Sequence, residues 1–160
     1  MSEILIAYFS ASGVTEKVGK RMAEAVNGDV FAIRPKEPYT EADLNWKNPF
    51  ARCNKEKIGK KGVPFVGKIE QIDRYGLVVI GFPIWYAGAP NIIKTFLKRY
   101  PMEGKRVAVF ATSGGSRIGK SAEKLKPFLS DSAQIVGSRL FSPDEKPEEL
   151  AAWIQSLPLA

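Results

Sequence analysis

The central segment of this chain reads Leu77-Val78-Val79-Ile80-Gly81-Phe82-Pro83-Ile84-Trp85-Tyr86-Ala87-Gly88-Ala89-Pro90. Its first part is a continuous apolar run, which predicts a strand buried on both faces of a sheet. Its second part is a loop bracketed by prolines, which holds Trp85 and Tyr86 beyond the carboxyl end of that strand. Rings in this position either stack on a flat ligand or fold back onto the core, and this segment alone leaves both alternatives open.

Apolar runs and amphipathic segments alternate on both sides of this segment. The runs predict five strands, at residues 4–9, 30–33, 77–81, 106–111 and 134–141. Helical spacing predicts helices at residues 14–26, from Pro90 onward, around residues 118–129 with Pro127 kinking or ending the helix, and near the C-terminus. The start of the last helix is left open, because residues 142–145 resemble a capping box but Pro147 would interrupt a helix that begins there. This alternation indicates an α/β protein with a five-stranded parallel sheet of order 2-1-3-4-5 and helices on both faces.

The chain of 160 residues is long enough for one domain with its own core. We expect a single domain over residues 1–160, with a basic insertion at about residues 35–74 between the second and third strands. Thr40 is a candidate cap for a short helix in this insertion. The net charge is +7, and residues 47–68 contribute seven basic residues against one glutamate. Such a run is either a solvated loop or an attraction site for an anionic partner.

Composition excludes several kinds of chemistry. The chain has no histidine, and Cys53 is its one cysteine, so Ser-His-Asp and Cys-His nucleophiles and the usual zinc ligand sets are excluded. We therefore assign no catalytic side chain and no metal ligand, and expect a cofactor to carry the chemistry of any reaction. The absence of a signal peptide, of a long apolar run and of a disulfide predicts a cytoplasmic protein without a membrane span. We expect no nucleic-acid partner.

Three loops are expected at one edge of the sheet, outside the carboxyl ends of the strands. The first loop, residues 10–15, offers three hydroxyls, a glycine and free N–H groups at the start of a helix, which suits an anion. Plain helix capping by serine or threonine is the alternative. The third loop, residues 112–116, contains adjacent glycines that let the backbone approach a ligand, or that form a flexible turn. Together with the aromatic second loop, the first and third loops predict a ligand with an anionic tail and a flat aromatic head.

These loops resemble those of the flavodoxin family, whose ligand is FMN. The phosphate loop of the family reads Ser/Thr-x-Thr-Gly-x-Thr, and residues 10–15 match it with Ser12 at the middle threonine. The chain is most similar to a subgroup with Gly-x-Pro-Ile-Trp-Trp-Gly-x-Ala-Pro and Thr-Ser-Gly-Gly-Ser-x-Ile-Gly motifs. Residues 81–90 and 112–119 match these motifs, and the resemblance runs from Ile4 to about Trp153. It implies a flavodoxin-like three-layer sandwich.

The resemblance also implies which residues bind FMN. The phosphate is expected at Ser10, Ala11, Ser12, Gly13, Val14 and Thr15. The isoalloxazine is expected between Pro83, Ile84, Trp85, Tyr86, Ala87 and Gly88 on one side and Thr112, Ser113, Gly114, Gly115 and Ser116 on the other. Two positions depart from the subgroup: Val14 stands where asparagine is frequent, and Tyr86-Ala87-Gly88 stands where Trp-Gly is commoner.

A competing motif lies in residues 114–121, which satisfy the Walker A pattern Gly-x-x-x-x-Gly-Lys-Ser. Alone it would indicate a P-loop NTPase. The motif follows the fourth strand, however, and none of the predicted strands ends in an aspartate placed to hold Mg²⁺. The NTPase is therefore a remote alternative.

Two functions follow from the resemblance. One is a redox protein that transfers electrons through bound FMN to or from a redox partner protein. The other is an NAD(P)H-dependent FMN oxidoreductase that acts on quinones or similar acceptors. Carriers of this family are typically acidic and this chain is basic, which favours something other than an ordinary carrier. The sequence does not specify the oligomeric state.

Overall fold

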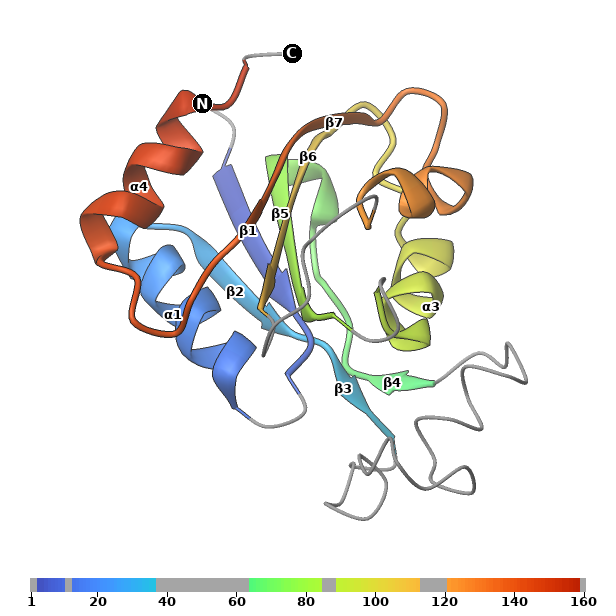
Figure 1. The fold of residues 1–160 in the computed structure, drawn as a ribbon. Coiled ribbons are helices and arrows are strands. Elements are labelled where there is room, and N and C mark those ends of the chain that lie inside the picture. The colour runs from blue at the N-terminus through green and yellow to red at the C-terminus, as the bar shows by residue number, and fades with distance from the viewer. Residues whose placement is uncertain (1–2, 11–12, 37–63, 85–88, 113–120, 159–160) are drawn as a thin grey trace.

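A computed structural model describes residues 3–10, 13–36, 64–84, 89–112 and 121–158 of the chain. Five parallel strands form its central sheet: β1 (Glu3–Tyr8), β2 (Asp29–Ala32), β5 (Tyr75–Pro83), β6 (Arg106–Thr112) and β7 (Gln134–Leu140). Their order is β2-β1-β5-β6-β7 (Figure 1). Because these are the five predicted strands in chain order, the 2-1-3-4-5 topology is confirmed.

Helices cover both faces of the sheet (Figure 1). On one face, α1 (Val14–Val26) and α4 (Pro147–Ser156) bury Met22 and Leu150 against the strands. On the other, α3 (Asn91–Arg99) and η2, a 3₁₀ helix at Glu123–Phe128, bury Phe96 and Leu125. The sheet thus separates two apolar cores, which confirms the three-layer sandwich.

The structure corrects one predicted helix and defines the start of another. The segment around residues 118–129 was expected to be an amphipathic α-helix, but its described part is the 3₁₀ helix η2 with Pro127 inside it. Pro127 has no backbone N–H and therefore cannot continue an α-helical ladder. The last helix does not start at the capping box. That helix begins at Pro147, because the first turn of a helix does not need the N–H that proline lacks. The Ser142 hydroxyl does not cap the helix and accepts a bond from the Asp144 N–H.

The ends of the basic insertion are paired. Beyond β2, β3 (Arg34–Pro35) pairs in antiparallel fashion with β4 (Phe65–Val66), and the Lys36 N–H donates to the Pro64 carbonyl at 3.0 Å. β2 itself ends at Ala32, so the prediction that the second strand ends before Pro35 is confirmed, and Pro35 lies in a separate two-residue edge strand, where a proline is tolerated. Residues 37–63, which include Thr40 and most of the basic run, lie outside the described residues.

The chain returning from the insertion is attached to α3. Arg99 donates to the Gly67 carbonyl at 3.3 Å, and its guanidinium lies 5.4 Å from the centre of the Phe65 ring. The Tyr100 hydroxyl accepts a bond of 3.0 Å from the Ile69 N–H. In the part of the chain that the structure describes, no helix is long and apolar enough to cross a membrane.

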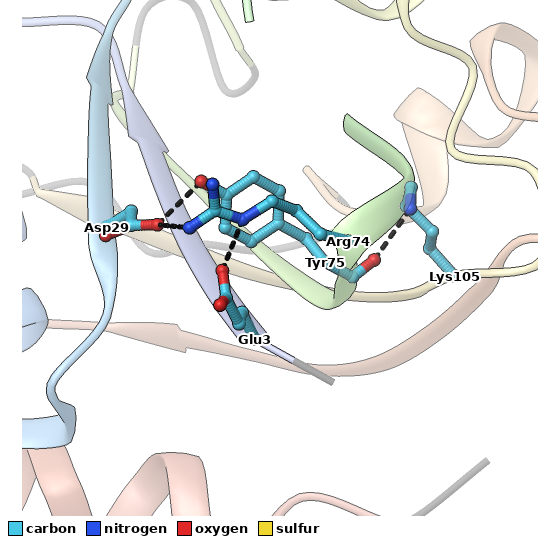
Figure 2. Close-up of polar contacts among 5 residues, drawn as sticks. All are labelled: Glu3, Asp29, Arg74, Tyr75 and Lys105. Carbon is cyan, nitrogen blue, oxygen red and sulfur yellow. Dashed lines mark hydrogen bonds and ion pairs between the residues drawn. The ribbon is translucent and has the colours of Figure 1, made fainter. Parts of the chain in front are cut away.

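The amino-terminal edge of the sheet carries a charged network, which follows η1 (Ile72–Arg74) (Figure 2). Arg74 lies between two carboxylates: its Nε donates to Glu3, and its Nη2 donates to Asp29 at 3.0 Å. The Tyr75 hydroxyl donates to the same Asp29 oxygen at 2.7 Å. The Lys105 ammonium donates to the Tyr75 carbonyl at 2.6 Å. The network therefore links the first residues of β1, β2 and β5 to the start of β6.

Candidate functional site

The carboxyl ends of β1, β5 and β6 lie at one edge of the sheet, and the three predicted loops start there (Figure 1). Two backbone hydrogen bonds join the loops at their bases. The Phe9 N–H donates to the Gly81 carbonyl at 3.0 Å, which holds the first loop beside β5. The Ile84 N–H donates to the Thr112 carbonyl at 2.9 Å, which joins the second loop to the third.

A buried side-chain bond joins the first loop to the third. The hydroxyl oxygens of Thr15 and Thr112 lie 2.7 Å apart, although 97 positions separate these residues in the sequence. Both residues are almost wholly buried, with 1% and 2% of their surface exposed. Since β5 lies between β1 and β6, this bond spans the end of the central strand. Thr112 thus contacts the first loop through its hydroxyl and the second loop through its carbonyl.

The first loop enters α1 through Gly13, whose φ of 93° is accessible mainly to glycine. The Gly13 N–H donates to the Ser10 hydroxyl oxygen at 3.0 Å, which leaves the hydroxyl hydrogen of Ser10 able to bind a ligand. The first helical bond runs from the Lys17 N–H to the Gly13 carbonyl. The N–H groups of residues 14–16 therefore have no helical acceptor, and no described side chain caps them. The bond from Gly13 to Ser10 is itself a serine contact at the helix start, and Ser12 lies outside the described residues, so anion binding by this loop stays a prediction.

Electrostatics at this edge depend mainly on neutral donors. No lysine or arginine occurs in residues 10–15. The nearby Glu16 carboxylate accepts a bond from the Tyr8 hydroxyl at 3.4 Å and pairs with Lys20 at 3.2 Å. Burial, reinforced by the negative charge of Glu16, raises the pKa of the Tyr8 hydroxyl, so Tyr8 remains a neutral donor. The arrangement can bind an anion through N–H dipoles and hydroxyls rather than through a cation.

The structure brings together the bases of all three loops but describes only part of each. Ser10, Gly13, Val14 and Thr15 lie in the first loop, Pro83 and Ile84 at the start of the second, and Thr112 at the start of the third. Val14, with 37% of its surface exposed, is one of the few large apolar side chains open to solvent. The other predicted site residues lie outside the described residues: Ala11, Ser12, Trp85, Tyr86, Ala87, Gly88, Ser113, Gly114, Gly115 and Ser116.

One residue that supports the site was not predicted to do so. At Gly81, a Cβ atom would lie 2.1 Å from Cζ of Phe110, so the Phe110 ring packs directly on the Gly81 backbone. This packing lies beneath the start of the second loop, two residues before Pro83. A glycine inside an otherwise apolar strand is a sequence signal for such close approach. The pairing of Thr15 with Thr112 had no sequence signal, because either hydroxyl alone is typical of a helix start or a strand end.

The structure argues against the Walker A alternative. Residues 114–120 lie outside the described residues, but Ser121, the serine that would bind Mg²⁺, is fully buried with 0% exposed surface. The described central strands end at Tyr8, Ala32, Pro83, Thr112 and Leu140, so none supplies the aspartate that such a site needs.

Two solved structures are similar to this chain in both sequence and fold. A protein assigned as a flavoprotein, from Bacteroides eggerthii, has a solved structure with 40% sequence identity, full coverage of both chains and a TM-score of 0.89. A second such protein, from Bacteroides uniformis, shares 35% identity over 97% of this chain and 99% of its own, with a TM-score of 0.86. No curated protein sequence matched the chain.

A more distant structure has the same fold. A flavoprotein from Lactobacillus acidophilus, solved in complex with FMN, is 23% identical over 88% of this chain and 93% of its own, with a TM-score of 0.73. The sequence profile described as Flavodoxin matches residues 3–157. Since that match includes every strand and helix of the central sandwich, the chain belongs to the flavodoxin family.

Proposed function

We propose that this protein binds FMN and transfers electrons through the bound cofactor, and that residues 1–160 form one flavodoxin-like domain with a basic insertion at about residues 35–74. One observation carries the proposal: Thr112 joins the bases of all three loops, through its hydroxyl to Thr15 and through its carbonyl to Ile84. Three loops fixed at one sheet edge are suited to a ligand that must contact all of them. The FMN complex of the Lactobacillus flavoprotein supports FMN as that ligand.

The first loop fits the phosphate of FMN. The Gly13 backbone turns in the left-handed region, and nothing lies within 4 Å of the position that a Cβ atom would occupy there. The N–H groups of residues 14–16 and the Ser10 hydroxyl are available as donors at the positive end of the α1 dipole. In this proposal, Ala11 and Ser12 complete the phosphate loop.

The second and third loops are proposed to hold the flavin ring. Pro83, Ile84 and Thr112 are placed at the bases of these loops, where β5 and β6 lie in register. Trp85, Tyr86, Ala87 and Gly88 are proposed to flank the ring on one side, and Ser113, Gly114, Gly115 and Ser116 on the other. Bound FMN would supply the redox chemistry, while the chain binds it, orients it and excludes water from it.

The direct test compares FMN with riboflavin, which lacks the phosphate. Titration of the purified protein, followed by quenching of flavin fluorescence, is expected to show FMN binding at least tenfold tighter than riboflavin binding. The reason is that riboflavin leaves the donors of the first loop without an anion. Equal affinity for the two flavins would refute the proposed phosphate loop, and no binding of either would refute the function.

An NAD(P)H-dependent oxidoreductase is the second candidate, favoured by the net charge of +7. A basic protein can attract the phosphates of a dinucleotide by long-range electrostatics. Mixing the FMN-loaded protein with NADPH without oxygen separates the two candidates. Bleaching by NADPH alone would support the oxidoreductase, whereas bleaching only after addition of a separate reductase would support the carrier.

A further inference from the structure

Glu16 occupies the position in α1 from which a glutamate commonly caps a helix. α1 begins at Val14, after the N-cap residue Gly13, so Glu16 is the third helical residue and lies in the first turn. A glutamate at this position turns back to bind the backbone N–H of the N-cap residue in a capping box. A carboxylate is also stabilised there by the positive end of the helix dipole. The same end of α1 thus suits both the Glu16 carboxylate and an anionic ligand.

The Glu16 carboxylate is bound to two side chains instead. Its Oε1 atom accepts a bond from the Tyr8 hydroxyl at 3.4 Å and lies 3.2 Å from the Lys20 ammonium, one helical turn further along α1. The Gly13 N–H, which a capping glutamate would bind, donates to the Ser10 hydroxyl oxygen at 3.0 Å. The carboxylate is therefore held by side chains of β1 and α1 rather than by the backbone at the helix start.

Tyr8 is fixed against α1 by close packing. Only 2% of its surface is exposed, and a Cβ atom at Gly19 would lie 2.8 Å from Cδ2 of the Tyr8 ring. The ring thus packs directly on the α1 backbone, where a glycine leaves room for it. Its hydroxyl reaches Glu16, in the turn of α1 that precedes Gly19. Tyr8 therefore supplies a hydrogen-bond donor whose place is set by the packing of the core.

Lys20 supplies the positive charge that faces Glu16. The two residues are four positions apart with the glutamate nearer the N-terminus, which is the favourable order for an ion pair on a helix. The side chains of Glu16 and Lys20 are 35% and 60% exposed, so solvent screens their attraction. A carboxylate near a helix start gains a similarly small amount from the helix dipole. A modest interaction is therefore enough to decide which of the two arrangements Glu16 adopts.

We propose that Tyr8 and Lys20 are positioning residues, which keep the Glu16 carboxylate off the start of α1 and so leave it open to the phosphate of FMN. This inference rests on the proposed function. While Tyr8 and Lys20 hold Glu16, no described side chain caps the N–H groups of residues 14–16. A released carboxylate would bind these donors and repel the phosphate, because both groups are negative. The contacts of Glu16 thus set how strongly the protein prefers FMN to riboflavin.

The test compares the affinities of full-length variants for FMN and for riboflavin, measured by quenching of flavin fluorescence. In Lys20→Gln, FMN affinity is expected to fall about two- to fourfold, the scale of one helical ion pair together with the repulsion of the released carboxylate. Riboflavin affinity should not change, because riboflavin has no phosphate. Tyr8→Phe removes the hydroxyl without altering the charge and should act in the same direction.

Lys17→Gln is the matched control, because it removes the same charge from the same helix. Lys17 is exposed, and among the described residues no carboxylate lies within ion-pair distance of it. FMN affinity should therefore fall less in Lys17→Gln than in Lys20→Gln. An equal or larger loss in Lys17→Gln would mean that only the overall charge of α1 matters, and would overturn the inference.

The decisive variant combines Lys20→Gln with Glu16→Ala. Removal of the carboxylate should restore the FMN affinity lost in Lys20→Gln, because no side chain is left to compete with the phosphate. Glu16→Ala alone should bind FMN at least as tightly as wild type. If Lys20 merely held α1 in place, removing its partner would not reverse the loss. The same loss with and without the Glu16 carboxylate would overturn the inference.

Inorganic phosphate separates a failure of this inference from a failure of the proposed function. If FMN binds and its affinity ratio to riboflavin is the same in all variants, the proposed function stands and the inference is overturned. If wild type binds neither flavin, the proposed function is refuted, and phosphate at constant ionic strength becomes the probe. It should then raise the melting temperature of wild type more than that of Lys20→Gln, and equal shifts would overturn the inference as well.

Discussion

The two edges of the central sheet use polar groups in opposite ways. At the amino-terminal edge, Glu3, Asp29, Arg74 and Tyr75 satisfy one another in a charged network (Figure 2). At the carboxyl-terminal edge, the one buried bond between two side chains that is described, Thr15 to Thr112, joins neutral hydroxyls, and the N–H groups of residues 14–16 have no helical acceptor. The same strands, β1 and β5, connect the two edges. The difference is that the polar groups of one edge pair with one another, whereas the N–H groups of residues 14–16 at the other edge have no helical acceptor.

Burial determines how much each edge contributes to stability. Arg74, Glu3 and Asp29 keep 44–50% of their side-chain surface exposed, so water screens their attraction. Thr15 and Thr112 are almost wholly buried, so an unpaired hydroxyl there would lose water without gaining a partner. The Thr15–Thr112 bond is thus more sensitive to substitution than the exposed ion pairs of Arg74, although it is a single bond.

The largest effect is expected beneath the carboxyl-terminal edge, for Gly81→Ala. The new methyl would lie 2.1 Å from the Phe110 ring in a packed core, so we expect a loss of about 1–3 kcal/mol or more in the free energy of unfolding. Urea denaturation of the apoprotein measures it. Adding Phe110→Leu should recover part of the loss, and failure to recover any would show that the ring is not the cause.

The next largest effect is expected for Thr15→Val, which leaves the buried Thr112 hydroxyl without its partner. The free energy of unfolding should fall by about 1–3 kcal/mol. FMN affinity should also fall, because the first and third loops are no longer joined. Thr15→Ser, which keeps the hydroxyl, is the matched control and should retain both properties.

A double variant sharpens this result. Thr15→Val with Thr112→Val removes both hydroxyls, so stability should be closer to wild type than in Thr15→Val alone. An additive loss would mean that the two side chains act independently and that the bond between them has no special role.

Local patterns in the sequence predicted the strand and loop positions, and the topology usual for an open α/β sheet predicted the strand order. Continuous apolar runs such as residues 77–80 identify buried parallel strands, and glycines with hydroxyls after a strand identify ligand loops. The bond between Thr15 and Thr112 could not be predicted, because it depends on where β6 ends relative to α1. Pairing across 97 residues is a property of the tertiary structure and not of either segment.

The error over residues 118–129 has a local cause. The stripe that ends at Leu129 has helical spacing, but Pro127 limits the described part to a 3₁₀ helix. The charged network at the amino-terminal edge was not predicted either. Its members, among them Glu3, Asp29 and Arg74, are ordinary surface residues in the sequence, and only the sheet order places them together.

A smaller effect, at the amino-terminal edge, is expected for Tyr75→Phe. The hydroxyl donates to Asp29 at 2.7 Å, so its loss should lower the free energy of unfolding by about 1 kcal/mol at neutral pH. FMN affinity should not change, because Tyr75 lies at the opposite end of β5 from the loops. A loss of FMN affinity in this variant would contradict the expectation that the amino-terminal edge does not affect FMN binding.

The same variant should alter the pH dependence of stability. Burial, reinforced by the bond to Asp29, raises the pKa of Tyr75 from 10.0 to about 12. The folded state therefore holds the Tyr75 proton when the unfolded state has lost it, so this contribution is complete below pH 10 and disappears between pH 10 and 12. Melting temperatures over this range should fall more steeply for wild type than for Tyr75→Phe, and identical slopes would show that Tyr75 does not titrate differently in the two states.

The smallest effect is expected for Arg74→Gln, although it removes both ion pairs of the network. Arg74 is exposed, and solvent and salt screen its attraction to Glu3 and Asp29. Its denaturation midpoint should differ from wild type by less than that of Tyr75→Phe at low salt, and the difference should vanish in 1 M sodium chloride. A larger loss than that of Tyr75→Phe would mean that the charged groups stabilise the amino-terminal edge more than the buried hydroxyl does. The two edges would then differ in stability because one is charged and the other is neutral, and not because one is exposed and the other is buried.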